Sequence, residues 1–273
     1  MNAVTARVLG RGLAGFAHGG LRIRRDVVRS QIAASFPERD AAWVRHTARA
    51  SYRHFGAELS AVAGGSRSIE AALARVRDPA GIVDKLARAR DGFARVIVTG
   101  HIGNWELAGA YLASRIPVTT VVRRQQGGWD RRLLAMREGM SLDIVHHDEG
   151  ARKVVRALEA GRCVSLVADQ HSFTGSASLP FLGRPAWTRL GPARLALRAG
   201  VPLAFGALIR DGDGYDVLWE PVGDDVMASG DAVAVTREWL GALERAVRRW
   251  PAQYYWFHRR WKKRSPGEGV STV

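Results

Sequence analysis

A histidine and a glutamate stand five residues apart directly after an apolar run, and this spacing is the strongest sign of chemistry in the chain. His101 and Glu106 follow residues 96–100, which read as the end of a buried strand. On one ideal helix the two side chains would lie about 140° apart, so they would not share a face. They can meet if His101 lies in a turn and Glu106 in the first turn of the next helix, and glycines flank His101 to permit that turn. The carboxylate would then hold one imidazole tautomer while the other ring nitrogen takes a proton from a hydroxyl group. The alternative is a structural histidine beside a solvated glutamate.

Alternating strands and helices must position these residues. The strand-like runs cover residues 95–99, 118–123, 142–146, 163–168, 203–209 and 215–220. Helical segments lie between most of these runs, which predicts an α/β fold: a mostly parallel central sheet flanked by helices on both faces. The Asp-Gly pairs between the last two runs favour a hairpin and hence an antiparallel edge. Two longer helical segments, residues 22–34 and 39–62, predict a helical N-terminal cap.

Polar side chains lie at the ends of four of the predicted strands, where open α/β sheets place their sites. They are His101, Arg123-Arg124, His146-His147 and Asp169-Gln170-His171. Arg124 could grip a phosphate or carboxylate with two parallel hydrogen bonds, and Arg123 is the weaker candidate. Asp169 could orient a basic group or cap a loop. No known metal-ligand spacing is present, so we expect no metal.

Two further stretches are unusual. Residues 181–188 form a turn-rich loop with large apolar side chains, which could line a pocket or pack on the surface. Residues 250–264 interleave aromatic and basic side chains, which suits a membrane interface or single-stranded nucleic acid. We favour a third interpretation, in which this segment packs onto the folded chain, because buried aromatic side chains are the commoner case. In that reading the aromatics dock into the core and the basic side chains stay in water.

Charge points to an anionic partner. Forty-one lysines and arginines against 26 acidic residues give the 273-residue chain a net charge of +15. Such an excess suits nucleic acid, an anionic membrane surface, or a phosphorylated or acidic-carrier substrate. The single cysteine, Cys163, reads as a buried core thiol. No apolar run is long enough for a transmembrane helix. We expect a short amphipathic segment over residues 1–24, with possible membrane contact, and a single domain over residues 25–273.

Together these residues resemble the lipid A biosynthesis (late) acyltransferase family, of lauroyl and myristoyl type. Actinobacterial phosphatidylinositol mannoside acyltransferases look like close relatives. Five blocks carry the resemblance: Ser-Phe-Pro-Glu at 35–38, Thr-Gly-His-Ile-Gly-Asn-Trp-Glu-Leu at 99–107, Val-Val-Arg-Arg at 121–124, Asp-Gln at 169–170 and the run at 253–262. The chain departs from the family pattern at residues 123–125, where the usual Tyr-Arg-Pro is replaced by Arg-Arg-Gln. It also departs in its N-terminal region, which is short and contains several arginines, so we do not expect an integral membrane anchor.

The resemblance implies a glycerolipid acyltransferase-like fold and transfer of a fatty acyl chain to a glycolipid hydroxyl, with a lipid A precursor-like acceptor. The donor would be a thioester of acyl carrier protein or coenzyme A, with no further cofactor. His101 would be the general base and Glu106 its partner. The implied substrate-binding residues are Asn104, Arg124, Asp169, Gln170, Gly183 and Arg184. The resemblance further implies peripheral attachment to the anionic cytoplasmic face of a bacterial inner membrane.

Two other functions remain open on the residues alone. In a thioesterase or lipid hydrolase, water would replace the acceptor alcohol. A non-enzymatic binder of anionic membrane or nucleic acid would use the positive charge and the C-terminal aromatic-basic run. Polar groups collected at several strand ends favour an enzyme over a binder, so we expect no nucleic-acid partner.

Overall fold

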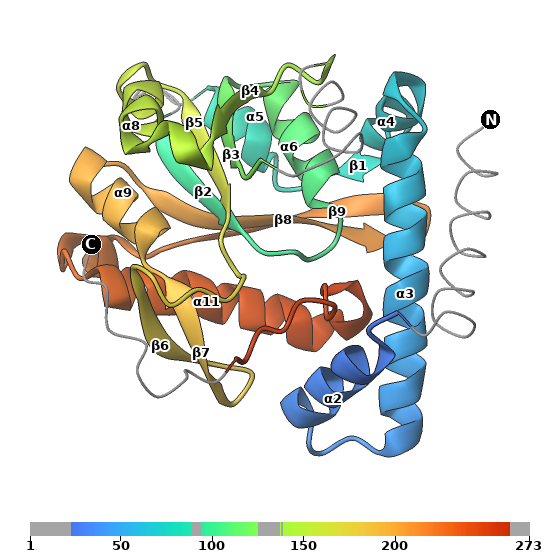
Figure 1. Cartoon of the computed structure of the whole chain (residues 1–273). Helices are drawn as coiled ribbons and strands as arrows, with labels where there is room; N and C mark the ends of the chain where they lie inside the picture. Colours follow the sequence, from blue (N-terminus) through green and yellow to red (C-terminus); the bar gives the residue numbers. More distant parts are fainter. Residues whose placement is uncertain (1–22, 89–93, 125–136, 138, 263–273) are drawn as a thin grey trace.

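The computed structural model of this chain describes residues 23–88, 94–124, 137 and 139–262. One of the helical segments expected between the strands, residues 129–140, lies almost wholly outside these residues. So does nearly all of the segment expected over residues 1–24. The described helices are layered about one central sheet (Figure 1).

The central sheet has seven strands in the order β1-β9-β8-β2-β5-β3-β4. β2 pairs in parallel with β5 and β8, and β3 pairs in parallel with β4 and β5. β9 is joined to β8 by the Asp-Gly turn and pairs with it antiparallel. On its other side, β9 pairs in parallel with β1. The strands are β1 Val76–Arg77, β2 Arg95–Thr99, β3 Val118–Val122, β4 Asp143–His146, β5 Cys163–Val167, β8 Leu203–Asp211 and β9 Gly214–Pro221. This architecture confirms the predicted α/β class and the antiparallel edge.

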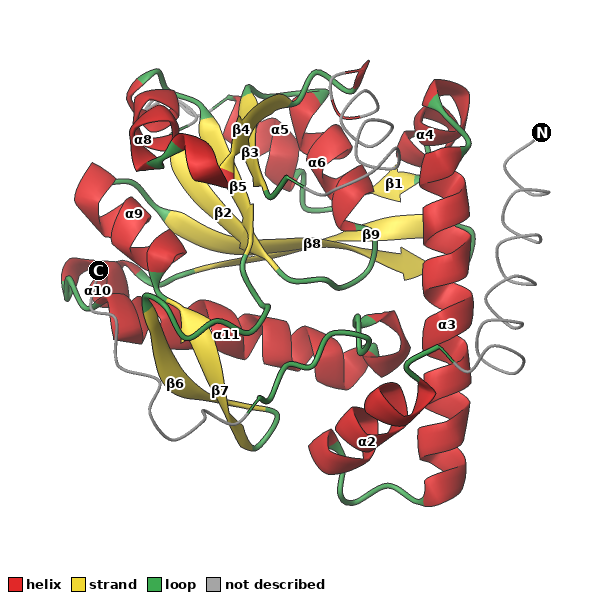
Figure 2. Ribbon diagram, in the orientation of Figure 1, coloured by secondary structure: helices red, strands yellow, loops and turns green. Residues whose placement is uncertain are grey.

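Helices cover both faces of the sheet (Figure 2), which is why the central strands are apolar on both sides. Along β2, Val96 and Val98 belong to the hydrophobic cluster that includes residues of α9 (Gly191–Ala199) and α11 (Ala232–Arg249). Ile97, between them, belongs to the opposite cluster. That cluster includes residues of α4 (Ser66–Leu73), α5 (Ile82–Ala87) and α6 (Trp105–Ala113). Because successive side chains of a strand point to opposite faces, β2 contributes to a hydrophobic core on each side of the sheet.

The described helices follow the predicted helical segments closely in most places. They are α2 Arg25–Ser35, α3 Ala41–Ala63, α4 Ser66–Leu73, α5 Ile82–Ala87, α6 Trp105–Ala113, α8 Ala151–Glu159, α9 Gly191–Ala199, α10 Asp224–Ala228 and α11 Ala232–Arg249, with 3-10 turns η1 His147–Glu149 and η2 Pro251–Gln253. Among the described helices, none combines the length and the apolar character needed to cross a bilayer.

Residues 181–188, expected as a loop, lie in a β-hairpin. Its strands are β6 Ser176–Phe181 and β7 Arg184–Arg189, paired antiparallel outside the main sheet. The connection is Leu182-Gly183, and both residues have positive φ, 51° and 71°, as tight two-residue hairpin turns require. Paired prolines, Pro180 and Pro185, mask the strand pattern, because proline is unusual inside a sheet.

The C-terminal aromatic-basic run packs back onto the molecule. Tyr254 and Trp256 are buried, as the favoured reading predicted. The expectation that its basic side chains all stay in water is wrong for Arg260, which is 1% exposed. The Arg260 guanidinium donates to the Trp187 carbonyl oxygen at 2.6 Å and to Thr188 Oγ1 at 2.5 Å. Those bonds tie the run to β7, so this arginine serves packing rather than an external partner.

Candidate active site

The turn between β2 and α6 carries His101 and is fixed by backbone contacts. Gly103 has φ of 60°, and a Cβ there would lie 1.9 Å from the Leu208 carbonyl oxygen. Only glycine fits such a position. The Gly103 N–H donates to the Gln253 carbonyl oxygen and the Asn104 N–H to that of Leu208, each at 3.0 Å. Asn104 then caps α6, because its Oδ1 accepts a first-turn N–H at 2.9 Å. The turn is therefore held from both sides by the fold.

Asp169, just past β5, supplies the carboxylate that contacts the His101 ring. Asp169 Oδ1 lies 2.6 Å from His101 Nδ1, and Oδ2 accepts the His101 backbone N–H at 3.0 Å. β2 and β5 are parallel neighbours with Thr99 opposite Val167, so the residues two positions further on leave the sheet together. Although burial by itself raises the pKa of Asp169, the charge and hydrogen bonds of His101 bring that pKa below its usual value. An ionised Asp169 favours the tautomer with the proton on Nδ1.

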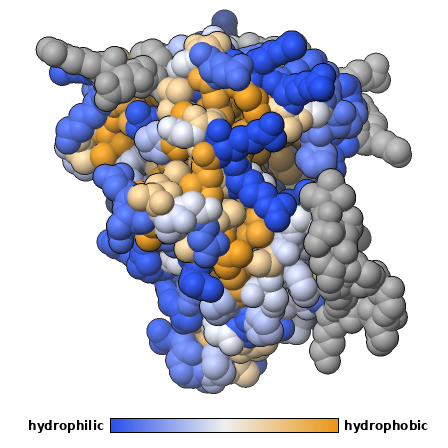
Figure 3. Space-filling view, turned by 90° about the vertical axis from the view of Figure 1, so that its left-hand side faces the viewer, coloured by the Kyte–Doolittle hydropathy of each residue, from blue (hydrophilic) through white to orange (hydrophobic). Residues whose placement is uncertain are grey.

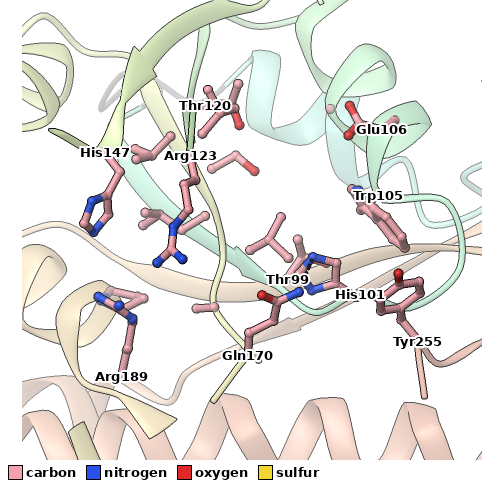
Figure 4. Close-up of a pocket in the computed structure, with 18 of the residues that line it drawn as sticks. Thr99, His101, Trp105, Glu106, Thr120, Arg123, His147, Gln170, Arg189 and Tyr255 are labelled. Atoms are coloured by element: carbon pink, nitrogen blue, oxygen red, sulfur yellow. Dashed lines mark hydrogen bonds between the residues drawn. The ribbon is translucent and has the colours of Figure 1, made fainter. Parts of the chain in front are cut away.

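The second ring nitrogen of His101 is accessible from the adjoining cleft. Nε2 lies 3.2 Å from the side-chain nitrogen of Gln170, and both residues line the cleft. Trp105 and Tyr255 flank the ring, with centroids 4.9 Å and 5.8 Å from that of the imidazole (Figure 4). The imidazole keeps 19% of its side-chain surface exposed. Nε2 therefore faces the cleft, where a bound hydroxyl group that displaces the Gln170 amide can give it a proton.

Glu106 does not hold the His101 ring. Its carboxylate pairs with Arg137 on the cleft wall, at 2.9 Å and 2.5 Å, and Figure 4 shows it set apart from the imidazole. The two residues do occupy the turn and the first helical turn, as their spacing predicted. Successive helical residues point about 100° apart, and it is Trp105 that faces the imidazole. The expected contact is therefore replaced by one from a neighbouring strand.

The cleft above His101 has a volume of about 1030 Å³. Its walls combine an apolar part with a basic part. The apolar part includes Val121, Leu142, Val154, Leu166 and Leu195. The basic part includes Arg123, Arg189 and Lys262. Space and lining suit a molecule with a long apolar portion and a negatively charged portion.

Arg124, the favoured strand-end arginine, turns away from this cleft. Its guanidinium is exposed and pairs with Asp148 at 3.0 Å and Glu149 at 3.5 Å. Arg123, the weaker candidate, lines the cleft instead. Neighbouring residues in extended chain point to opposite sides, so only one of an adjacent pair can face the site.

The remaining predicted contacts divide between the cleft and the hairpin. Gln170 and Asn104 line the cleft, although Asn104 is only 4% exposed and is engaged as the helix cap. Gly183 and Arg184 belong to the β6–β7 turn and are outside the described lining of the cleft. Arg184 lies over the Trp261 ring, 4.4 Å from its centroid. The structure thus gives Arg184 a packing contact with Trp261 and places Gly183 in the hairpin turn.

A buried polar network under the turn was missed by the sequence reading. Glu58, on α3, accepts hydrogen bonds from Asn104 Nδ2 and the Tyr215 hydroxyl, each at 2.7 Å, and pairs with Arg210. Although burial by itself raises it, the pKa of Glu58 is lowered by His54 and then by Arg210 and Tyr215. This network connects α3, β8 and β9 to the residue that caps α6. Nothing in the spacing of a lone glutamate on a helix would have revealed it.

His258 is a second residue that the sequence reading did not single out. It lines the cleft, and its Nε2 accepts the backbone N–H of His171 at 3.0 Å. Burial lowers its pKa to about 4. His258 is therefore neutral near pH 7 and holds the chain beyond Asp169 in place.

Metal-ligand groups and the single cysteine can be examined in the described part of the chain. There, no group of three or more His, Cys, Asp or Glu side chains is arranged to hold a metal ion. Cys163 is buried in β5, and burial raises the pKa of its thiol to about 11. A thiol with so high a pKa is a poor nucleophile at neutral pH.

Comparison with known proteins decides the family. The family model described as bacterial lipid A biosynthesis acyltransferase matches residues 3–263. The chain belongs to this family. Among its relatives, a phosphatidylinositol mannoside acyltransferase of Mycolicibacterium smegmatis is 27% identical over 66% of this chain and 60% of its own length. The Mycobacterium tuberculosis protein of that name is 25% identical over 77% and 63%.

A second kind of relative matches over more of both chains. The lipid A biosynthesis palmitoleoyltransferase of Escherichia coli K12 is 26% identical over 95% of this chain and 86% of its own length. The chain spans less than two thirds of the length of the mycobacterial relatives that it matches. Membership confirms the family that the five blocks indicated, and it leaves the acceptor to be established.

Proposed function

We propose that this protein transfers a fatty acyl chain from a thioester to a hydroxyl group of a glycolipid, with His101 as general base. One observation carries the proposal. The His101 ring is fixed through Nδ1 by ionised Asp169 and presents Nε2 to a cleft with apolar and basic walls. Family membership supports the reaction class.

In the proposed reaction, the acceptor hydroxyl gives its proton to Nε2 as its oxygen attacks the thioester carbonyl carbon. The C–O bond forms, the C–S bond breaks, and the proton passes from His101 to the departing sulfur. Asp169 stabilises the transient imidazolium, because its negative charge lies 2.6 Å from Nδ1. The backbone N–H groups of the first turn of α6, next to His101, are the proposed donors to the oxyanion.

Glu106 has a different proposed role from the one its spacing suggested. Its bidentate pair with Arg137 holds a guanidinium on the cleft wall. We therefore treat Glu106 as a positioning residue and Asp169 as the residue that orients the base. The apolar part of the cleft would take the acyl chain, and Gln170 would contact the reacting group beside Nε2.

The membrane-bound setting is also a proposal. The +15 charge would draw the protein to an anionic bilayer surface and would attract an acidic acyl carrier protein. Figure 3 shows hydrophobic surface between strongly hydrophilic patches on one face, which suits contact with a lipid substrate. We propose peripheral attachment at the cytoplasmic face of a bacterial inner membrane, and these features and the family support it.

The test is an assay with two products. The purified full chain is given a radiolabelled acyl thioester of coenzyme A or of acyl carrier protein, with a bacterial glycolipid extract as acceptor. We expect label in an alkali-labile acylated lipid. Release of free fatty acid alone would instead identify a thioesterase, and salt-sensitive DNA binding without transfer would identify a binder. Either result would refute the proposal.

A further inference from the structure

Two arginines face each other across one end of the cleft. Arg123 follows β3 and Arg189 ends β7, and Figure 4 shows their guanidinium groups directed toward one another. Within the described residues no carboxylate pairs with either one. The acids that line the cleft or lie beneath it are already engaged: Glu106 with Arg137, Asp169 with His101 and Glu58 with Arg210.

The proximity of these two cations is costly in the absence of an anion. Burial lowers the pKa of Arg189, and the positive charge of Arg123 lowers it further. Arg123 is exposed and Arg189 is half-buried, so water screens the repulsion between them only in part. A negatively charged group between the two guanidiniums would remove that repulsion and could accept forked hydrogen bonds from both.

The starts of two helices also add positive potential to the cleft. Gly191 and Pro192 begin α9, and Gly150 and Ala151 begin α8, and all four residues line the cleft. The N-terminal end of a helix carries a partial positive charge and first-turn N–H groups without intrahelical partners. Two helices of nine residues each thus point their positive ends at the cleft that contains the two arginines.

We propose that Arg123 and Arg189 form a binding subsite for a phosphate group of a substrate. Phosphate suits the site because it offers several acceptor oxygens to two guanidinium forks, more than a single carboxylate does. The inference rests on the proposed acyl transfer for its choice of substrate. Both substrate classes can bring such a group: the donor as the phosphate of its pantetheine carrier, the acceptor as a phosphorylated headgroup. Arg124, one residue away and exposed like Arg123, supplies a matched control because it already pairs with Asp148.

A binding experiment tests the subsite without requiring catalysis. Inorganic pyrophosphate is titrated at low salt into the full chain and into R123Q, R189Q and R124Q, with thermal melts to verify folding. We expect binding by the wild type and R124Q, and affinity lowered about tenfold or more in R123Q and R189Q. No binding by the wild type, or equal binding by all four proteins, overturns the proposal. A lower pyrophosphate affinity in R123Q and R189Q, but not in R124Q, supports the phosphate subsite even if the wild type transfers no acyl group. The subsite and the proposed acyl transfer can therefore fail separately.

Kinetics then identify the source of the phosphate. Each variant is assayed with acyl coenzyme A and with an acyl thioester of N-acetylcysteamine, which carries no phosphate, against phosphorylated and phosphate-free glycolipids. A donor phosphate predicts that R123Q and R189Q raise KM about tenfold for acyl coenzyme A only. An acceptor phosphate predicts the same rise for the phosphorylated glycolipid only. Equal increases for phosphate-bearing and phosphate-free substrates would show that the arginines act on packing, and would overturn the subsite.

Discussion

Replacing Asp169 by asparagine separates the carboxylate found beside His101 from the one that the sequence spacing suggested. The substitution keeps the size of the side chain and removes its charge. Asparagine can also turn its amide nitrogen toward Nδ1, which would move the ring proton to Nε2 and leave no free acceptor in the cleft. We therefore expect D169N to fold and to lose most of its activity.

The size of the loss follows from the contact that is removed. A hydrogen bond to a charged group contributes about 1.5–3 kcal/mol, which corresponds to a roughly 10- to 150-fold change in rate. Inverting the tautomer adds to this, and the same change in a Ser-His-Asp triad costs about 10⁴-fold in kcat. The 2.6 Å bond to Nδ1 and the buried position of Asp169 argue for the upper part of this range. We predict a loss of kcat of about 10²- to 10⁴-fold.

The assay compares D169N with two matched variants. D148N makes the same substitution on an exposed acid that pairs with Arg124, and it should keep wild-type activity. E106Q removes the partner of Arg137 but should leave the His101 tautomer unchanged. Nitrogen-15 NMR of the histidine rings measures this directly, because the Nδ1 proton should persist in E106Q and shift or vanish in D169N. A loss smaller than tenfold in D169N, or an altered tautomer in E106Q alone, would refute the assignment.

Two further predictions concern the buried groups around the site. E58Q should lower the free energy of unfolding by about 3–5 kcal/mol in urea titrations, because Arg210 loses the charge that compensates it, whereas E70Q on an exposed position should not; an equal effect of the two would contradict the network. H258Q should flatten the pH dependence of stability between pH 6.5 and about 4. In that window the unfolded chain binds a proton on His258 that the folded chain excludes, so wild-type stability falls as the pH falls. The exposed control H46Q should leave that slope unchanged, and an unchanged slope in H258Q would contradict the burial of a neutral ring.

The sequence was sufficient for the parts of the structure that local patterns control. Apolar runs marked the parallel strands, and the Asp-Gly turn marked the antiparallel edge. The polar residues after the strands marked the site, since carboxyl ends of parallel strands gather at one edge. These local patterns did not identify the carboxylate that contacts His101. That contact depends on the register of β2 against β5, which pairs residues 68 positions apart.

Other differences have equally local physical causes. Successive residues of the extended chain beyond β3 point to opposite sides. Two adjacent arginines do not reveal which of them, Arg123 or Arg124, points into the cleft. The β6–β7 hairpin was hidden by Pro180 and Pro185. Arg260 reads as a surface residue, yet its guanidinium finds acceptors on β7 that only the folded chain brings near.

The most direct measurement of the central claim is the rate of acyl transfer by H101A. The variant is compared with wild type in a single-turnover assay that follows label from the acyl thioester into glycolipid, after matching thermal melts have verified its fold. We expect no transfer above the rate without protein, because no other base among the described residues occupies the position of Nε2. Transfer by H101A at a rate near that of the wild type would contradict it.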